Sequence, residues 1–208
     1  MSASDCWTQA HSGIDIDLLN PDPSKIRLDD IARCLSRIPR FLGATIGDYP
    51  WNVAQHSILV ESLMPSHSSP EDRLAALLHD AHEAYVGDLP SPVKWAMDEI
   101  YSAQNKDPYV GTPPSFFFRE ITQRLDRAIY KTFGIAPDIR VLSIVNKADL
   151  TALAVERALL MAPCEREWGN LPPLPDPVPQ LRPCHPPARA EEVFLDRFNV
   201  LQRLRHGL

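Results

Sequence analysis

Apolar residues recur every three or four positions along most of the chain, the spacing of helices that turn one face toward a core. In residues 27–38, for example, Leu28, Ile31 and Leu35 share one face, and Pro39 ends the pattern. The same spacing predicts five further helices, over residues 51–64, 71–86, 115–134, 139–161 and 190–205.

The ends of these segments and the regions between them complete the prediction. Ser115 is a suitable N-cap and Gly134 a suitable C-terminal stop for the helix over 115–134. No run of alternating apolar and polar residues is long enough to predict a sheet. We therefore predict an all-α fold, a helical bundle that forms one domain over residues 1–208 with its core at about 27–162.

Two segments are predicted to be irregular. Residues 163–189 are rich in proline, which favours an extended strap that is either packed or mobile. Residues 97–115 also read as a loop, and their position near the polar stretch described below makes them a candidate lid.

Composition and charge narrow the class of protein. The chain has 208 residues, of which 44% are hydrophobic, enough for one buried core. Its net charge of −6 argues against a protein that holds long nucleic acid by its phosphates. No segment resembles a secretion signal or a membrane span, so we expect a cytoplasmic protein. The cysteines are far apart and are expected to be reduced thiols: Cys6, Cys34, Cys164 and Cys184.

Polar side chains interrupt the apolar pattern of residues 74–94, "LAALLHDAHEAYVGDLPSPVK". In a continuous helix the leucines would share one side, and His79, Asp80 and Glu83 would share the other. The remaining positions on the polar side are alanines rather than charged residues, which indicates an enclosed polar cluster. The alternative is a hydrogen-bonded pair of His79 and Asp80 in the core, with Glu83 at the surface.

Two more helices place a polar residue on an apolar stripe. His56 lies on the core-facing stripe of one helix, and Asp149 on that of another. His56 alone could be a hydrogen-bonded core histidine, and Asp149 could pair with Lys147 or Arg157. A buried carboxylate without a partner is costly, however, so Asp149 has to be neutralised, paired or bound to a metal.

Taken together, these positions indicate a metal site. Two imidazoles and two carboxylates suit one divalent transition metal with positions left open for water and substrate. The candidate ligands are His56, His79, Asp80 and Asp149. Such a set accepts Mn, Co, Fe, Ni or Zn.

The segments that carry these residues resemble those of the HD-domain metal-dependent phosphohydrolases, which are named for their His-Asp pair. The likeness runs through "GIDIDLLNPDPSKIRLDDIARCLSRIPRF", "YPWNVAQHSILV", "ALLHDAHEAYVGDLPSPVK" and "VNKADLTALAVE", and is closest to the branch of bacterial 5'-deoxynucleotidases. It implies a helical HD domain, the four metal ligands named above, and a homodimer.

The resemblance also implies roles for neighbouring residues. Glu83 would orient the attacking water or take its proton, and Asp88 would assist at the leaving oxygen, although Asp88 could instead be an ordinary turn residue. Arg40 would contact phosphate. Phe41 would pack on the sugar or base, but the deoxynucleotidases have tryptophan there, so the sugar preference stays open.

Two more residues are candidates for contact with the substrate. Lys94 could be a second phosphate contact or a surface lysine. His82 is expected beside the substrate or behind the ligands, because the chain has no histidine from 83 to 184 that would complete a two-metal site.

The sequence thus predicts an enzyme that hydrolyses a small nucleotide, most simply a (deoxy)nucleoside 5'-monophosphate. A dNTP triphosphohydrolase is the alternative within the same class, and a cluster of extra lysines and arginines near the site would favour it; the sequence shows no such cluster. A nucleotide-binding or sensing module without turnover is the alternative from another class.

Overall fold

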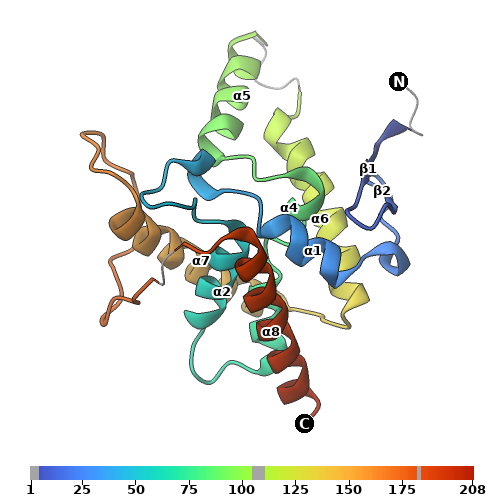
Figure 1. Cartoon of the computed structure of the whole chain (residues 1–208). Coiled ribbons are helices and arrows are strands. Elements are labelled where there is room, and N and C mark those ends of the chain that lie inside the picture. Colours follow the sequence, from blue (N-terminus) through green and yellow to red (C-terminus); the bar gives the residue numbers. More distant parts are fainter. Residues whose placement is uncertain (1–4, 105–110, 182–183) are drawn as a thin grey trace.

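The computed structural model describes residues 5–104, 111–181 and 184–208, and these form eight α-helices. The helices are α1 (Leu28–Leu35), α2 (Val53–Ser62), α3 (Pro70–Leu77), α4 (Glu83–Val86), α5 (Ser91–Gln104), α6 (Pro114–Thr132), α7 (Ile139–Leu160) and α8 (Pro187–Arg205). Two short strands, β1 (Trp7–Gln9) and β2 (Asp15–Asp17), pair antiparallel near the N-terminus (Figure 1). The predicted all-α fold is confirmed.

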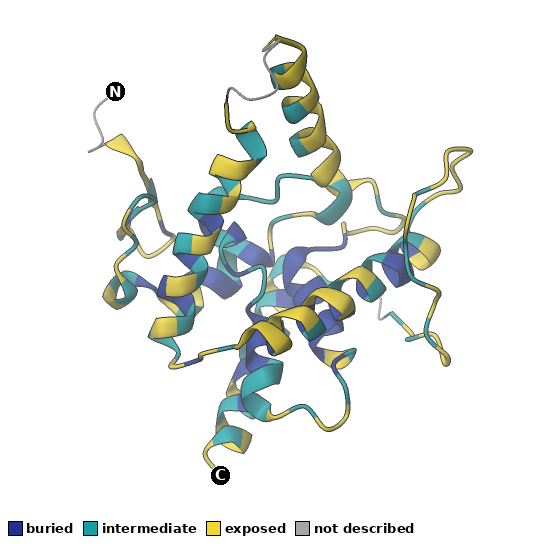
Figure 2. Cartoon of the chain, turned by 180° about the vertical axis from the view of Figure 1, so that it is seen from behind, coloured by how far each residue is buried: buried dark blue, intermediate teal, exposed yellow. Residues whose placement is uncertain are grey.

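Helix α2 lies at the centre of the molecule. It packs against α1, α3, α7 and α8, and most of its residues are buried. Figure 2 shows the buried residues gathered where these helices meet. Helix α8 starts at Pro187, three residues before the predicted start, and contributes Phe194 and Leu201 to the core.

A buried carboxylate ties three of these helices together. Glu61 on α2 is 1% exposed, and Arg197 on α8 donates to its Oε2 atom at 2.7 Å. Arg73 on α3 donates to the same carboxylate. This network satisfies a buried negative charge.

The helix predicted over residues 71–86 is broken in the middle. Helix α3 ends at Leu77, a tight turn over residues 78–82 follows, and α4 begins at Glu83. The turn is held by hydrogen bonds to the third preceding residue, such as that from the Ala81 amide to the Leu78 carbonyl. His79 and Asp80 therefore lie on a turn rather than on one face of a helix, and the prediction of a continuous helix was wrong.

The loop predicted over 97–115 was also partly wrong, because α5 continues to Gln104 and α6 begins at Pro114. Of the candidate lid, residues 105–110 lie outside the described residues. Ser115 does not cap α6; its amide and hydroxyl donate to Asp98 on α5 and join the two helices. Gly134 follows α6 with a positive φ of 64°, as its predicted role as a stop requires. Helix α5 stands away from the body of the molecule, whereas α6 reaches back to it and buries Leu125 and Ile129 in the core (Figure 1).

The proline-rich segment has no helix in its described residues up to 186, as predicted, but its last three residues form the start of α8. Leu181 and Cys184 pack against the core, and the amide of His185 donates to Gln55 on α2. Residues 182–183 lie outside the described part. All four cysteines are free thiols. Among the helices that the structure describes, none has the length and apolar character needed to cross a membrane.

Candidate metal centre

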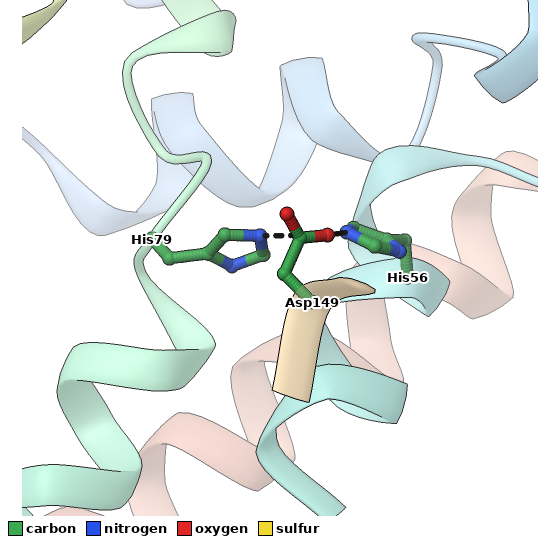
Figure 3. A group of neighbouring side chains, drawn as sticks. All are labelled: His56, His79 and Asp149. Carbon is green, nitrogen blue, oxygen red and sulfur yellow. Dashed lines mark ion pairs between the residues drawn. The ribbon is translucent and has the colours of Figure 1, made fainter. Parts of the chain in front are cut away.

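The four candidate ligands come from three parts of the fold and meet at one point. His56 is on α2, His79 and Asp80 are on the turn before α4, and Asp149 is on α7. His56 Nε2 lies 3.1 Å from Asp149 Oδ1 and 3.5 Å from Asp80 Oδ2, and His79 Nε2 lies 3.1 Å from Asp80 Oδ2. Figure 3 shows the two imidazoles on either side of the Asp149 carboxylate.

Both imidazoles turn a buried nitrogen without a hydrogen bond toward these carboxylates. Among the described residues, neither His56 Nε2 nor His79 Nε2 has a hydrogen-bond partner. The other ring nitrogen of His79, Nδ1, lies 2.9 Å from the Ala76 carbonyl oxygen, which can only accept a hydrogen bond. His79 Nδ1 therefore carries the hydrogen, and its Nε2 lone pair faces the carboxylates. A divalent metal ion would satisfy this donor set of two imidazole nitrogens and two carboxylates.

The electrostatics also favour a positive charge at this point. Burial and the charge of Arg40 lower the pKa of His56, but the charge of Glu156 and the contacts with Asp149 and Glu156 outweigh them and raise it to about 10. Burial raises the pKa of Asp80, yet the adjacent histidines lower it further, and the net shift is downward. The carboxylates thus stay ionised and stabilise a nearby cation.

Glu156 completes the surroundings of the centre, and the sequence analysis did not identify it. This glutamate on α7 is 0% exposed, and its Oε1 atom lies 2.7 Å from His56 Nδ1. Trp51 Nε1 donates to Oε1 at 2.7 Å, and Arg40 Nη2 donates to Oε2 at 3.0 Å. Its position seven residues after Asp149 places it two turns further along the same helix face, and this spacing was the available signal.

Arg40, predicted as a phosphate contact, lies beside the candidate ligands. Its side chain is 12% exposed, and Nη1 lies 3.9 Å from Asp80 Oδ2. The Arg40 guanidinium is 5.4 Å from the ring centroid of Phe41, and that ring is 5.8 Å from the ring of Trp168 in the proline-rich segment. Phe41 and Leu42 both have a positive φ, 53° and 55°, a strained backbone of the kind found beside functional sites.

The two predicted catalytic carboxylates also lie at the centre. Glu83 is 8% exposed, and its Oε2 atom has no hydrogen-bond partner among the described residues. Burial, followed by the charges of Asp80 and Asp88, raises the pKa of Glu83 well above its usual range. Burial likewise raises the pKa of Asp88, which follows Gly87 with its positive φ of 75°. A carboxyl with a raised pKa holds its proton more tightly than a free one, which suits a group that passes protons during catalysis.

His82 and Lys94 lie at the edge of this cluster. Ligand atoms of Asp80, His82 and Glu83 fall within 4.8 Å of one another. His82 Nδ1 is 2.9 Å from Asp126 Oδ1 on α6, which fixes the orientation of its ring. Lys94 is close enough to Asp88 for its charge to lower the pKa of that carboxyl, but its Nζ atom sits 5.9 Å from the ring centroid of Phe118.

A cleft of about 800 Å³ opens from the centre between α6 and α7. His79, Asp80 and Asp149 line its inner end. Arg127 and Lys131, one turn apart on α6, line it further out, and neither forms an ion pair with any residue that the structure describes. The sequence shows no cluster of cations near the motif segments, but helix α6 brings these two residues to the cleft.

Comparison with known proteins places the chain among relatives of its own size. No family model matches it. It is 33% identical to an uncharacterized protein of Rhodobacter capsulatus, RCAP_rcc00048, over 97% of this chain and 98% of that protein. It is also 33% identical to the uncharacterized protein YfdR of Escherichia coli, over 91% of this chain and 90% of that protein. The chain therefore belongs to the family that contains RCAP_rcc00048 and YfdR.

Proposed function

We propose that the protein is a metal-dependent phosphohydrolase that acts on a nucleotide. One observation carries the proposal: His56 and His79 direct buried Nε2 atoms without hydrogen bonds toward the carboxylates of Asp80 and Asp149. These four residues would hold one divalent ion, of Mn, Co, Fe, Ni or Zn. Such an ion, when bound, acts as a Lewis acid and makes water a better nucleophile at neutral pH.

Arg40 would bind the reacting phosphate. Its guanidinium lies within 4 Å of Asp80, and burial lowers its pKa less than the charges of Glu156 and Asp80 raise it, so it stays charged. Planar guanidinium groups bind phosphate oxygens through two parallel hydrogen bonds. Lys94, beside Asp88, is the second cation of this region and would add a point charge near the leaving group.

Glu83 and Asp88 would move the protons. Hydrolysis requires one group to accept a proton from the attacking water and another to supply a proton to the leaving oxygen. The two carboxyls lie close enough to interact, since the charge of Asp88 raises the pKa of Glu83. We assign Glu83 to the water and Asp88 to the leaving oxygen, with His82, fixed by Asp126, on the substrate side.

The choice of a nucleotide rests on the resemblance of the motif segments to HD-domain 5'-deoxynucleotidases. The simplest substrate is a (deoxy)nucleoside 5'-monophosphate, whose nucleoside could contact Phe41 or extend into the cleft between α6 and α7. The Phe41 ring also contacts Arg40 and Trp168, so these two side chains already cover part of its surface.

A second candidate is favoured by a specific feature: Arg127 and Lys131 line the cleft and form no ion pair within the described part of the chain. Further phosphates of a nucleoside triphosphate would place negative charge beyond the reacting group. Two cations one helical turn apart would stabilise that charge. A triphosphohydrolase is therefore the alternative activity for the same centre.

The test is phosphate release from ribo- and deoxynucleoside mono-, di- and triphosphates. The protein is stripped of metal and resupplied with Mn, Co, Fe, Ni, Zn or Mg in turn. Metal-dependent release of inorganic phosphate from monophosphates supports the first candidate, and release of triphosphate supports the second. Protein that binds metal but turns over no member of the panel would contradict the proposal and favour a binding role.

A further inference from the structure

We infer that Glu156 is a positioning residue that couples the metal centre to the phosphate-binding arginine. The inference rests on the proposed function, because it takes His56 as a metal ligand and Arg40 as a phosphate contact. One buried carboxylate contacts both side chains, through different oxygen atoms. Nothing in the resemblance or in the relatives assigns a role to this residue.

Oxygen Oε1 of Glu156 fixes the state of the His56 ring. A carboxylate can only accept hydrogen bonds, so the 2.7 Å contact keeps a hydrogen on His56 Nδ1. Nε2 is then the nitrogen that would give up its proton and bind a metal through its lone pair. A carboxylate behind an imidazole ligand also holds the ring in place and makes it a stronger ligand.

Oxygen Oε2 of Glu156 holds one edge of the Arg40 guanidinium. Nη2 donates to it at 3.0 Å, and Nη1 is directed toward Asp80. The Nε atom of Arg40 is buried, and no described residue accepts its hydrogen. This arrangement leaves a preoriented donor for a phosphate oxygen beside the candidate ligands.

Trp51 holds the carboxylate itself. Its Nε1 atom donates to Oε1 at 2.7 Å, and its ring is 3% exposed. Indole nitrogen is only a donor, so this contact is satisfied only while Glu156 keeps its orientation. Displacement of Glu156 would therefore disturb the metal ligand and the phosphate contact together.

The test is Glu156→Gln, which keeps the size of the side chain but removes its charge and one acceptor. We expect metal affinity, measured by competition with a chelator, to fall about 10- to 100-fold. At saturating metal we expect KM for the best substrate of the panel to rise roughly tenfold, as for the loss of one charge-assisted hydrogen bond. Long-range ¹H–¹⁵N spectra of the histidine rings, assigned with His56→Gln, should show a smaller share of the Nδ1–H form of His56, because a neutral amide oxygen is a weaker acceptor than a carboxylate.

Glu61→Gln is the matched control. Glu61 is also a buried glutamate with two basic partners, but it lies in the α2–α3–α8 network rather than at the centre. A purely structural role for Glu156 predicts that both variants lose stability and that neither loses metal affinity. Should Glu156→Gln fail to fold, Trp51→Phe takes its place, with an expected two- to tenfold loss of metal affinity.

Unchanged metal affinity and an unchanged His56 ring state in the variant that folds would overturn the inference. The metal and NMR measurements need no substrate. A wild-type protein that binds metal and fails to hydrolyse nucleotides would contradict the proposed function, while these measurements would still decide the role of Glu156 toward His56.

Discussion

His56 Nδ1 lies 2.7 Å from the Oε1 atom of Glu156, although the two residues are 100 positions apart in the chain. The contact joins the central helix α2 to α7 behind the candidate metal centre. It gives His56 a defined ring state and leaves its Nε2 atom facing Asp80 and Asp149. The position of this nitrogen makes metal binding the central expectation.

Asp80→Ala and Glu83→Ala should separate metal binding from proton transfer. Asp80 lies within 3.5 Å of both imidazole Nε2 atoms, so its loss should abolish metal retention and turnover together. Glu83 is assigned to the attacking water, and its loss should leave the metal in place while turnover falls about 10²- to 10⁴-fold. Mass-spectrometric metal analysis of the purified variants measures the difference. Equal metal loss in both would show that the two roles are assigned wrongly.

Metal removal should lower thermal stability. A ligand that binds only the folded protein, at about 100 times its Kd, stabilises it by about 2.7 kcal/mol. For a chain of this length we expect Tm to rise by about 5–10 °C when metal is restored. His56→Gln should lose this increase, whereas His67→Gln, at an exposed position, should retain it. An increase of equal size in both variants would place the metal elsewhere.

Arg127→Ala and Lys131→Ala should report which nucleotide the cleft accepts. If the longer phosphate chain lies there, each substitution should raise KM for triphosphates roughly tenfold and leave KM for monophosphates unchanged. Arg119→Ala, an exposed arginine on the same helix outside the cleft, is the control for a general change of charge. Equal KM values for triphosphates in all three variants would argue against the second candidate activity.

Glu61→Gln should destabilise the fold without changing the metal affinity of the candidate centre. Its buried carboxylate accepts from Arg73 and Arg197, and loss of the charge should cost about 2 kcal/mol of unfolding free energy. Glu192→Gln removes an exposed partner of Arg189, and its effect on the unfolding free energy should be much smaller. Urea denaturation of both variants measures the two values. Similar losses would show that the α2–α3–α8 network contributes little.

The sequence predicted the helices with a core-facing stripe and the four residues that meet at the centre. The helices follow from the spacing of apolar residues, and the four residues from polar side chains that interrupt this spacing. His56 is the clearest example, since its ring is fully buried within the apolar stripe of α2. Whether the four residues bind a metal stays a prediction.

Other features lacked such a signal. No glycine or proline marks the end of α3 at Leu77. The apolar spacing continues through the turn that follows, so the sequence predicted one continuous helix there. Helix α5 has no buried residue, and its contacts are with α6 rather than the core, so it carries no stripe. A glutamate on a long helix is ordinarily expected to be exposed to solvent, so Glu156 was not identified from the sequence. Its seven-residue spacing from Asp149 was the one sign in the sequence, and the packing of α2 against α7 closes the position to water.

The most direct test is a titration of metal into stripped protein, followed by bound metal and phosphate release in the same samples. The proposed centre predicts that both rise together and level off at one metal ion per chain, and that Asp149→Asn loses both. Full phosphate release without metal, or a metal stoichiometry that Asp149→Asn leaves unchanged, would contradict a metal centre formed by His56, His79, Asp80 and Asp149.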